Sequence, residues 1–226
     1  MQETLVTEKV SLVLRSEIEK MKERIQQKAT ELFRRYGIRS ITMDEIAAQL
    51  SVSKKTIYQF FSDKEELVDA VVAEVIHYSQ ECASKDCKLA RNAVEEMFMT
   101  MEFIREMYSN MNPALLFDLE RSHPKSFRKF LEHKNKYLLK LVRDNLERGI
   151  AEELYRPDIN VDIIAKLRLE TMMLSFNQDL FPAARYNLPQ TQQQIIEHYL
   201  FGISSLKGHK LILKYKSALS HKSNKV

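Results

Sequence analysis

Glycine, proline and cysteine are scarce in this chain of 226 residues, which contains four, five and two of them respectively. So few glycines and prolines argue against folds with many tight turns, such as β-sandwiches, barrels and Rossmann folds. Two cysteines cannot form a disulfide scaffold, and without histidine partners nearby they cannot fill a four-ligand zinc site. Long helices are the natural alternative, and the length fits one domain, or one small and one larger domain.

Long hydrophobic runs and enzyme signatures are also missing. No segment reaches about 18 consecutive apolar residues, and the N-terminus lacks the apolar core of a secretory signal. The sequence therefore predicts a cytoplasmic protein with no membrane partner. It contains no G-x-S-x-G, Walker-type GK[ST] or H-E-x-x-H motif, and its six histidines are scattered singly. We therefore expect no catalytic residues, cofactor or metal ligands.

The net charge of +4 is unevenly distributed along the chain. After Leu206 there are six lysines and no acidic residue, so the rest of the chain is slightly acidic. This pattern predicts a basic tail over residues 207–226 that is solvated and at most partly ordered. Such a tail could add nonspecific attraction to phosphates, but the charge of the whole chain does not identify a nucleic-acid-binding protein.

Apolar residues recur with helical periodicity through most of the chain, which predicts an all-α fold. The first helix is expected from near Ser16 to Gly37, because glycine is favoured just past a helix C-terminus. Residues 1–15 are left unassigned. A capping box at Thr42 to Glu45 opens a short helix to about Leu50, and a second box at Ser62 to Glu65 opens a long helix.

A third short helix is predicted between these two, from an N-cap at Ser53 through Phe60. Lys54 and Lys55 in its first turn lie at the positive end of the helix dipole, where an anion such as a DNA phosphate would balance them. They could equally be solvated surface lysines. The two short helices share one compact apolar set and are separated by a three-residue turn, as in a helix-turn-helix. The set comprises Ile46, Ala47, Leu50, Val52 and Ile57.

The segment from Gly37 to Leu67, GIRSITMDEIAAQLSVSKKTIYQFFSDKEEL, resembles the signature of the TetR family of transcriptional regulators. The family commonly has glycine where this chain has Ser51 and Lys55, so operator sequences cannot be carried over. The resemblance implies phosphate contacts from Thr42, Tyr58 and Lys64. It also implies a major-groove face made of Ser53, Lys54, Lys55, Thr56 and Gln59. Within that face, the base contacts expected are Gln59 to adenine and Lys55 to guanine.

Residues 88–206 are predicted to form further helices with breaks near prolines and glycines, and they contain a stripe rich in methionine. Methionine suits a cavity for apolar ligands of varied shape, although it could simply fill the core. The resemblance implies a pocket here for a small apolar or amphipathic effector. The expected lining residues are Met97, Met101, Ile104, Tyr108, Phe117, Tyr137 and Asn177.

Two amphipathic helices, expected over residues 160–179 and from Thr191 onward, end this region. Glycine inside a helix costs about 1 kcal/mol relative to alanine, so Gly202 suggests close backbone approach. The resemblance implies that these helices pair across a two-fold axis in a homodimer, whereas packing within one chain is the alternative. The expected interface residues are Leu167, Thr171, Leu174, Ile195, Tyr199, Gly202 and Ile203.

These observations favour a ligand-responsive, dimeric transcriptional repressor that binds a palindromic double-stranded DNA operator and is released by an effector. The alternative is a DNA-binding regulator without an effector, controlled by a protein partner or by its abundance. The expected organisation is a helix-turn-helix domain over 16–65, a ligand-binding and dimerisation domain over 66–206, and the basic tail. Cys82 and Cys87 could act as a redox switch between the domains or be two unreactive thiols.

Overall fold

The computed structural model describes the backbone of residues 2–223 and the side chains of residues 17–218. The regular structure of this part of the chain is helical, and its one strand-like feature is an isolated bridge between Tyr155 and Ser204. The all-α prediction is confirmed. The elements are α1 Gln2–Tyr36, α2 Met43–Leu50, α3 Lys54–Tyr58, α4 Lys64–Leu89, α5 Ala93–Tyr108, α6 Leu115–Ser122, α7 Pro124–Glu132, the π-helical segment η1 His133–Leu138, α8 Leu139–Ala151, α9 Val161–Leu174, α10 Leu188–Ile203 and α11 Leu206–Ser223.

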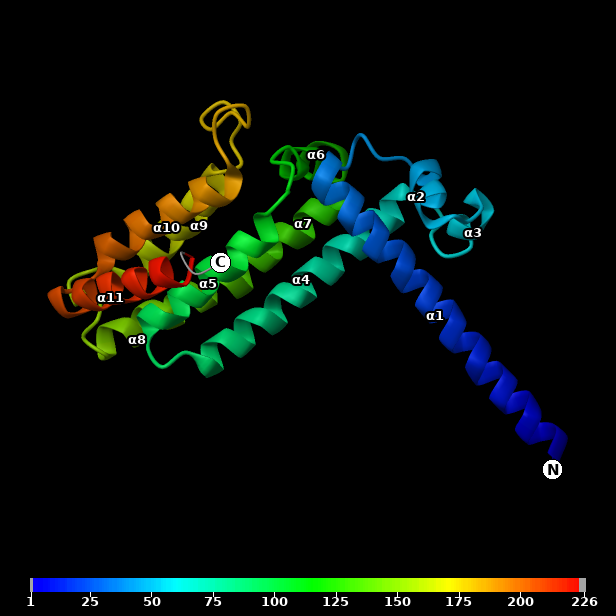
Figure 1. The fold of residues 1–226 in the computed structure, drawn as a ribbon, viewed down its shortest axis with the longest axis horizontal. Helices are drawn as coiled ribbons and strands as arrows, with labels where there is room; N and C mark the ends of the chain where they lie inside the picture. The colour runs from blue at the N-terminus through cyan, green and yellow to red at the C-terminus, as the bar shows by residue number, and fades with distance from the viewer. Residues whose placement is uncertain (1, 224–226) are drawn as a thin grey trace.

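The helices are arranged around two hydrophobic cores (Figure 1). The first core lies among α1, α2, α3 and the first half of α4, which form the N-terminal domain, and Leu119 of α6 is also buried in it. Phe33, Ile57 and Leu67 are among its buried residues. The second core lies among α5 and α8 to α11 and defines the C-terminal domain, with Leu146 and Ile196 inside it. Helix α4 runs from one domain to the other (Figure 1).

Three contacts attach the N-terminal domain to the segment α6–α7. The Asn112 backbone N–H donates to the Arg34 carbonyl over 2.6 Å, and the Arg39 N–H donates to the Asp118 carboxylate over 3.0 Å. Glu65, in the first turn of α4, meets the ring of His123 between α6 and α7. The N-terminal domain is therefore attached to the C-terminal domain through both α4 and α6.

Helix α4 begins one residue later than the sequence predicted. Its N-cap is Asp63, whose carboxylate accepts the Glu66 N–H over 2.8 Å. The expected partner of Ser62 was Glu65, but Ser62 instead donates its N–H and hydroxyl to Glu66, over 2.7 and 2.8 Å. The predicted box at Ser62 was therefore displaced by one position. The shift leaves Glu65 free to contact His123.

The prediction of a solvated tail over residues 207–226 was wrong for the part of it that the structure describes. These residues form α11, in which Ile212 is only 1% exposed and the ring of Tyr215 lies 5.2 Å from that of Phe98. The backbone at Gly208 passes so close to Leu154 that a Cβ would lie 2.0 Å from the Leu154 carbonyl oxygen. The apolar side of α11 packs on the second core, which the count of lysines did not indicate.

Helix α1 also extends further than expected, because it begins at Gln2 rather than near Ser16. It ends where predicted, at Gly37, whose φ of 84° is in the left-handed region that glycine adopts without strain. Within the residues that the structure describes, none of these helices is long and apolar enough to cross a membrane.

Candidate nucleic-acid interface and buried cavity

Helix α2 is fixed by the capping box that the sequence predicted at Thr42. The Thr42 hydroxyl accepts the Glu45 N–H over 3.2 Å, and the Thr42 N–H donates to the Glu45 carboxylate over 2.6 Å. These bonds lower the pKa of the Glu45 carboxyl, because they favour its charged form. The helix ends at Ser51, whose φ of 56° turns the chain toward α3. The local sequence thus sets both ends of the first short helix.

Helix α3 is a short helix whose inner side is held by Ile57, which is completely buried with Ile46 of α2. The Ser53 hydroxyl caps it by accepting the Thr56 N–H over 3.0 Å. Burial of Ile57 directs the other side outward, where Lys55, Gln59 and Tyr58 are exposed. Figure 1 shows α2 and α3 together at the end of the molecule, as a helix-turn-helix requires.

Lys54 has an acidic partner that sequence reasoning missed. Its ammonium lies 2.8 Å from the Asp44 carboxylate in α2 and 5.9 Å from the centre of the Tyr58 ring. The hydrogen bond and charge of Asp44 raise the pKa of the Lys54 ammonium. The cation at the start of α3 is therefore balanced within the chain, whereas no ion pair to Lys55 occurs among the described side chains. Asp44 is ten positions away, beyond the spacing at which helical pairs are sought.

Besides Thr42 and Lys54, three further predicted contact residues use their hydroxyl or amine groups within the fold. The Ser53 and Thr56 hydroxyls lie 2.8 Å apart, and the half-buried Lys64 ammonium donates to the Ile38 carbonyl over 2.6 Å. Burial lowers the pKa of the Lys64 ammonium. The DNA contacts expected of Thr42, Ser53, Lys54, Lys55, Thr56, Tyr58, Gln59 and Lys64 stay predictions. The structure brings these residues together on α2, α3 and the start of α4.

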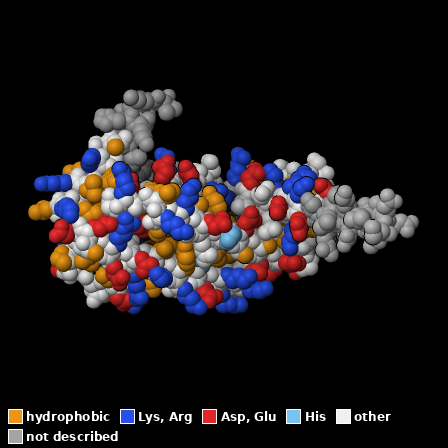
Figure 2. Space-filling model, turned by 90° about the horizontal axis from the view of Figure 1, so that it is seen from below, with side chains coloured by type: hydrophobic (Ala, Val, Ile, Leu, Met, Phe, Trp, Pro, Cys, Tyr) orange, Lys and Arg blue, Asp and Glu red, His pale blue; other side chains and the backbone are white. Residues whose placement is uncertain are grey.

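Basic side chains are not concentrated on the face of the molecule seen in Figure 2. Lysines and arginines there alternate with acidic and hydrophobic side chains. Charge over this face therefore provides no extended surface for phosphates. This agrees with the inference that the charge of the whole chain does not identify a nucleic-acid-binding protein.

A buried cavity of about 190 Å³ lies in the C-terminal domain, lined by residues of α4, α5, α8 and α9 and by Tyr199 of α10. Among the seven residues predicted for a ligand pocket, Met97, Ile104 and Tyr108 line it. Helical periodicity on α5 was sufficient to identify these three, because they share its inward face.

The structure does not bring the other four predicted pocket residues to this cavity. Phe117 is 56% exposed on α6, and Met101 is half-buried beside the second core. The Tyr137 hydroxyl donates to the Gln80 carbonyl over 3.1 Å. The Asn177 side chain instead closes a turn, because its oxygen accepts the backbone N–H groups of Asp179 and Leu180. Aromatic or amide character alone did not show which way these side chains point.

The polar groups on the cavity wall include several that the sequence did not single out. Glu96 is buried and paired with Arg148 over 3.2 Å. Burial lowers the pKa of the His133 ring, whose Nδ1 accepts from the Gln80 amide over 3.3 Å. Arg168 is 5% exposed, and its Nη1 has no hydrogen-bond partner. A lone arginine between two leucines of a mostly apolar helix was the available signal for this site.

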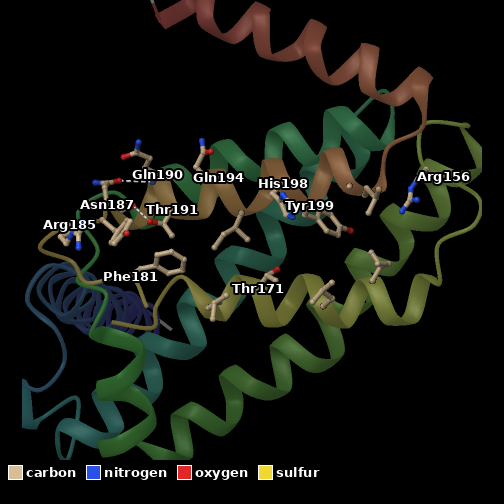
Figure 3. A pocket seen from close by; sticks show the side chains of 17 residues that line it. Arg156, Thr171, Phe181, Arg185, Asn187, Gln190, Thr191, Gln194, His198 and Tyr199 are labelled. Carbon is tan, nitrogen blue, oxygen red and sulfur yellow. Dashed lines mark hydrogen bonds between the residues drawn. The ribbon is translucent and has the colours of Figure 1, made fainter. Parts of the chain in front are cut away.

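A second, open groove of about 790 Å³ runs along α9 and α10 (Figure 3). Figure 3 shows Thr171 and Tyr199 along its length, with Arg156 near one end and Arg185 near the other. Every residue predicted for the dimer interface lines this groove: Leu167, Thr171, Leu174, Ile195, Tyr199, Gly202 and Ile203.

The walls of this groove include exposed apolar side chains. Leu167 is 53% exposed and Leu174 is also exposed, whereas Ile203 is buried at its base. A Cβ at Gly202 would meet no atom of the chain within 4 Å. Close approach within one chain therefore does not explain this glycine. The role of these residues in dimerisation stays a prediction.

Cys82 and Cys87 are free thiols in the structure. Burial and the nearby Glu96 carboxylate raise the pKa of the Cys87 thiol to about 11, so it is protonated at neutral pH. A protonated thiol reacts slowly with oxidants, which disfavours Cys87 as the sensing residue of a redox switch. No group of three or more histidine, cysteine, aspartate or glutamate residues is placed to hold a metal ion among the described residues.

The profile of the family described as "Bacterial regulatory proteins, tetR family" matches residues 25–71, the segment that contains this helix-turn-helix. The HTH-type transcriptional repressor KstR2 of Mycolicibacterium smegmatis is 24% identical over 84% of this chain and 93% of its own length. A TetR-family regulator from Agrobacterium tumefaciens has a similar structure, with a TM-score of 0.70 and 18% identity, covering 83% of this chain and all of that one.

A third similarity concerns a solved structure described as a gamma-butyrolactone receptor, an ArpA-like protein. It aligns with a TM-score of 0.60 at 18% identity, covering 91% of this chain and 98% of that one. At such identities these structures establish a shared fold. The sequence relatives are transcriptional regulators rather than enzymes.

Proposed function

The chain belongs to the TetR family of DNA-binding transcriptional regulators, and from this premise we propose that it is a dimeric repressor released from a palindromic operator by a small molecule. The observation that carries the proposal is the outer side of α3. There, Lys55, Tyr58 and Gln59 are exposed beside a turn and caps that fix their direction. A cation, a phenol and an amide on one short helix can bind both phosphates and base edges.

The groove along α9 and α10 supports the dimeric part of the proposal. It exposes the apolar side chains of Leu167 and Leu174, whose burial against a second copy would be favourable. It also contains Gly202, which has open space where a side chain would lie. A second copy packed there would form a four-helix interface of the isologous kind. Two α3 helices about 34 to 36 Å apart could then enter successive major grooves.

The buried cavity supports control by an effector. Its walls include Val75, Ile76 and Ser79 of α4, and the same helix begins at Lys64 beside the helix-turn-helix. A ligand that alters the packing around α4 would therefore change the position of the N-terminal domain. It acts as an effector only if it binds the released form more tightly than the DNA-bound form.

The test is binding of purified protein to the DNA upstream of its own gene and to shuffled DNA, over a series of salt concentrations. We expect tighter binding to the upstream DNA, weakening as salt rises. Gln59→Ala is expected to cost about 1 to 3 kcal/mol on the specific site and little on shuffled DNA. Gln193→Ala, an exposed glutamine on α10, is the matched control and should bind like the wild type.

Equal affinity of the wild type for the upstream and shuffled DNA would contradict an autoregulated repressor. Equal losses for Gln59→Ala on both DNAs would contradict the assignment of Gln59 to base recognition. A selection of bound sequences from random DNA then decides whether the operator lies elsewhere. Recovery of no enriched palindrome would contradict the proposed mode of binding.

A further inference from the structure

Arg168 is the cavity-lining residue with a buried side-chain atom that the described residues leave without a hydrogen-bond partner. It lies on α9, is 5% exposed, and has its guanidinium carbon 5.6 Å from the centre of the Tyr199 ring. Its Nη1 is buried without a hydrogen-bond partner, and no acidic group of the described side chains forms an ion pair with it. Buried polar atoms almost always have a partner, so an unpartnered guanidinium nitrogen needs an explanation.

The charge on this guanidinium does not disappear through deprotonation. Burial lowers the pKa of Arg168, but the group starts so basic that it stays charged at neutral pH. The Tyr199 ring offers its negative face, which compensates only a small part of the cost of burying a cation. Tyr108 and Tyr199 line the same cavity, so their hydroxyls are two possible neutral hydrogen-bond donors there.

The other charged groups of the cavity wall do not supply the missing anion. Glu96 is paired with Arg148 over 3.2 Å and also accepts from the Cys87 thiol. Asp86 also lines the cavity and burial raises the pKa of its carboxyl, but it forms no ion pair with Arg168; burial lowers the pKa of the His133 ring, which favours its neutral form. The cavity therefore combines largely apolar walls with one fixed, unpaired positive charge.

We propose that Arg168 anchors the carboxylate of a small amphipathic acid, whose apolar part packs against Met97, Ile104 and Met172 in the same cavity. This proposal rests on the proposed function, because it names the chemical class of the effector. A guanidinium and a carboxylate can form two parallel hydrogen bonds, which satisfies nitrogens that the fold leaves unpaired. The Tyr108 and Tyr199 hydroxyls would add neutral donors to the same oxygen atoms.

The size of the cavity limits the acid that it can hold. A volume of about 190 Å³ is below the roughly 300 to 1,000 Å³ that is typical of pockets for drug-sized ligands. A short or medium-chain acid is therefore a better fit than a steroid or a multi-ring drug.

The test measures binding of octanoate, octanamide and octylamine to the full-length protein without DNA, by titration calorimetry and thermal unfolding. The three probes share one alkyl chain and differ in the charge of the head group. Octanoate is expected to bind and raise the melting temperature, and octanamide to bind at least 10-fold more weakly. Octylamine should produce no shift.

Two variants separate an anion anchor from a structural arginine. Arg168→Met is expected to weaken octanoate binding about 10- to 100-fold, which corresponds to about 1.4 to 2.8 kcal/mol. It should leave the melting temperature of the free protein unchanged or raise it, because an unpaired buried charge is replaced by an apolar side chain of similar length. Arg105→Met, on the exposed side of α5, is the matched control and should bind octanoate normally.

Three results would overturn the proposal. The first is that octanamide and octanoate bind equally well. The second is that none of hexanoate, octanoate and decanoate binds the wild type. The third is that Arg168→Met without ligand loses much of its stability. The comparison of octanoate with octanamide uses only the wild type, so it holds even if a variant fails to fold. Specific DNA binding combined with no acid binding would remove this inference and leave the DNA-binding regulator intact. Acid binding without specific DNA binding would support the anion anchor at Arg168 and contradict the proposed DNA-binding regulator.

Discussion

Glu65 Oε2 and His123 Nδ1 lie 2.5 Å apart, and they join the first turn of α4 to the junction between α6 and α7. The His123 side chain is almost buried, so water competes little for this contact. The Arg39 N–H donates to Asp118 of α6 on the same side of the N-terminal domain. Helix α6 therefore helps to fix the direction in which the helix-turn-helix leaves the rest of the molecule.

We expect His123→Ala and Glu65→Ala to be coupled in their effects on stability. A hydrogen bond of this kind contributes about 0.5 to 1.5 kcal/mol, or more when it is charged. Urea unfolding of both single variants and the double variant gives the coupling energy. Strictly additive losses would show that the contact does not stabilise the protein. Glu17→Ala with His123→Ala is the control pair, because the two side chains make no contact in the structure.

Asp44→Asn is expected to tighten DNA binding. The change removes a carboxylate from the proposed DNA face and releases Lys54 from its ion pair. One additional phosphate contact from each protomer of the proposed dimer makes the dependence of log affinity on log salt steeper by roughly 1.8. Affinity measured at several salt concentrations checks both effects. Asp158→Asn, which removes the same charge far from α3, should change neither; weaker binding by Asp44→Asn would mean that Asp44 positions Lys54 for DNA.

Ser51→Gly is expected to stabilise the N-terminal domain. Ser51 has a φ of 56°, where a side chain is strained and glycine is not, so relief of about 0.5 to 1 kcal/mol is expected. Ser109→Gly is the matched control, because Ser109 has an ordinary φ of −59° and should gain nothing. Thermal unfolding compares the two. A lower melting temperature for Ser51→Gly would contradict the strain assigned to this turn.

Gly202→Leu is expected to dissociate the proposed dimer without unfolding the chain. A side chain at Gly202 meets open space within the protomer, but it would project into the groove where the second copy is proposed to pack. Sedimentation velocity should show a monomer for Gly202→Leu and a dimer for the wild type. Leu213→Glu, an exposed leucine on α11, should remain dimeric. A monomeric wild type would contradict the dimer itself.

The stability of the protein should fall as the pH drops below about 6.5 because of His133. Burial lowers the pKa of this ring in the folded protein, whereas the unfolded chain keeps an ordinary value of about 6.5. The unfolded state therefore binds more protons as the pH falls, which favours unfolding. His133→Gln should show a smaller loss over this range by urea unfolding. His77→Gln, at an exposed position of α4, should lose as much stability as the wild type.

Local signals in the sequence were sufficient to predict where the two short helices of the helix-turn-helix begin. Thr42 with Glu45, and Ser53 with Thr56, are separated by three residues, so their capping bonds follow from the order of residue types. The pairing of Lys54 with Asp44 depends instead on how α2 packs against α3, and the spacing of residues within one helix does not predict such a contact. A cap one residue away at Asp63 satisfies the same rules, so the displaced start of α4 was not predictable.

The cavity shows the same division between local and tertiary information. Met97, Ile104 and Tyr108 share one face of α5, so periodicity placed them together, whereas the pocket itself was implied by the resemblance. Arginine is usually a surface residue, and only the packing of α9 against α8 and α10 buries Arg168. Helix α11 was missed because its lysines outnumber the apolar residues that dock it, among them Ile212.

Helix α4 connects the two domains, and as a continuous helix it would also transmit a tilt at the cavity to the helix-turn-helix. At 1.5 Å of rise per residue, the stretch from Cys87 at the cavity to Lys64 at the helix-turn-helix is about 35 Å long. A tilt of about 5° around the Cys87 end would move Lys64 by about 3 Å, close to the 3.4 Å spacing of successive bases on one DNA strand. Rearrangements of side chains in the cavity, too small to change the fold, would thus be sufficient to misplace α3 by a whole base step.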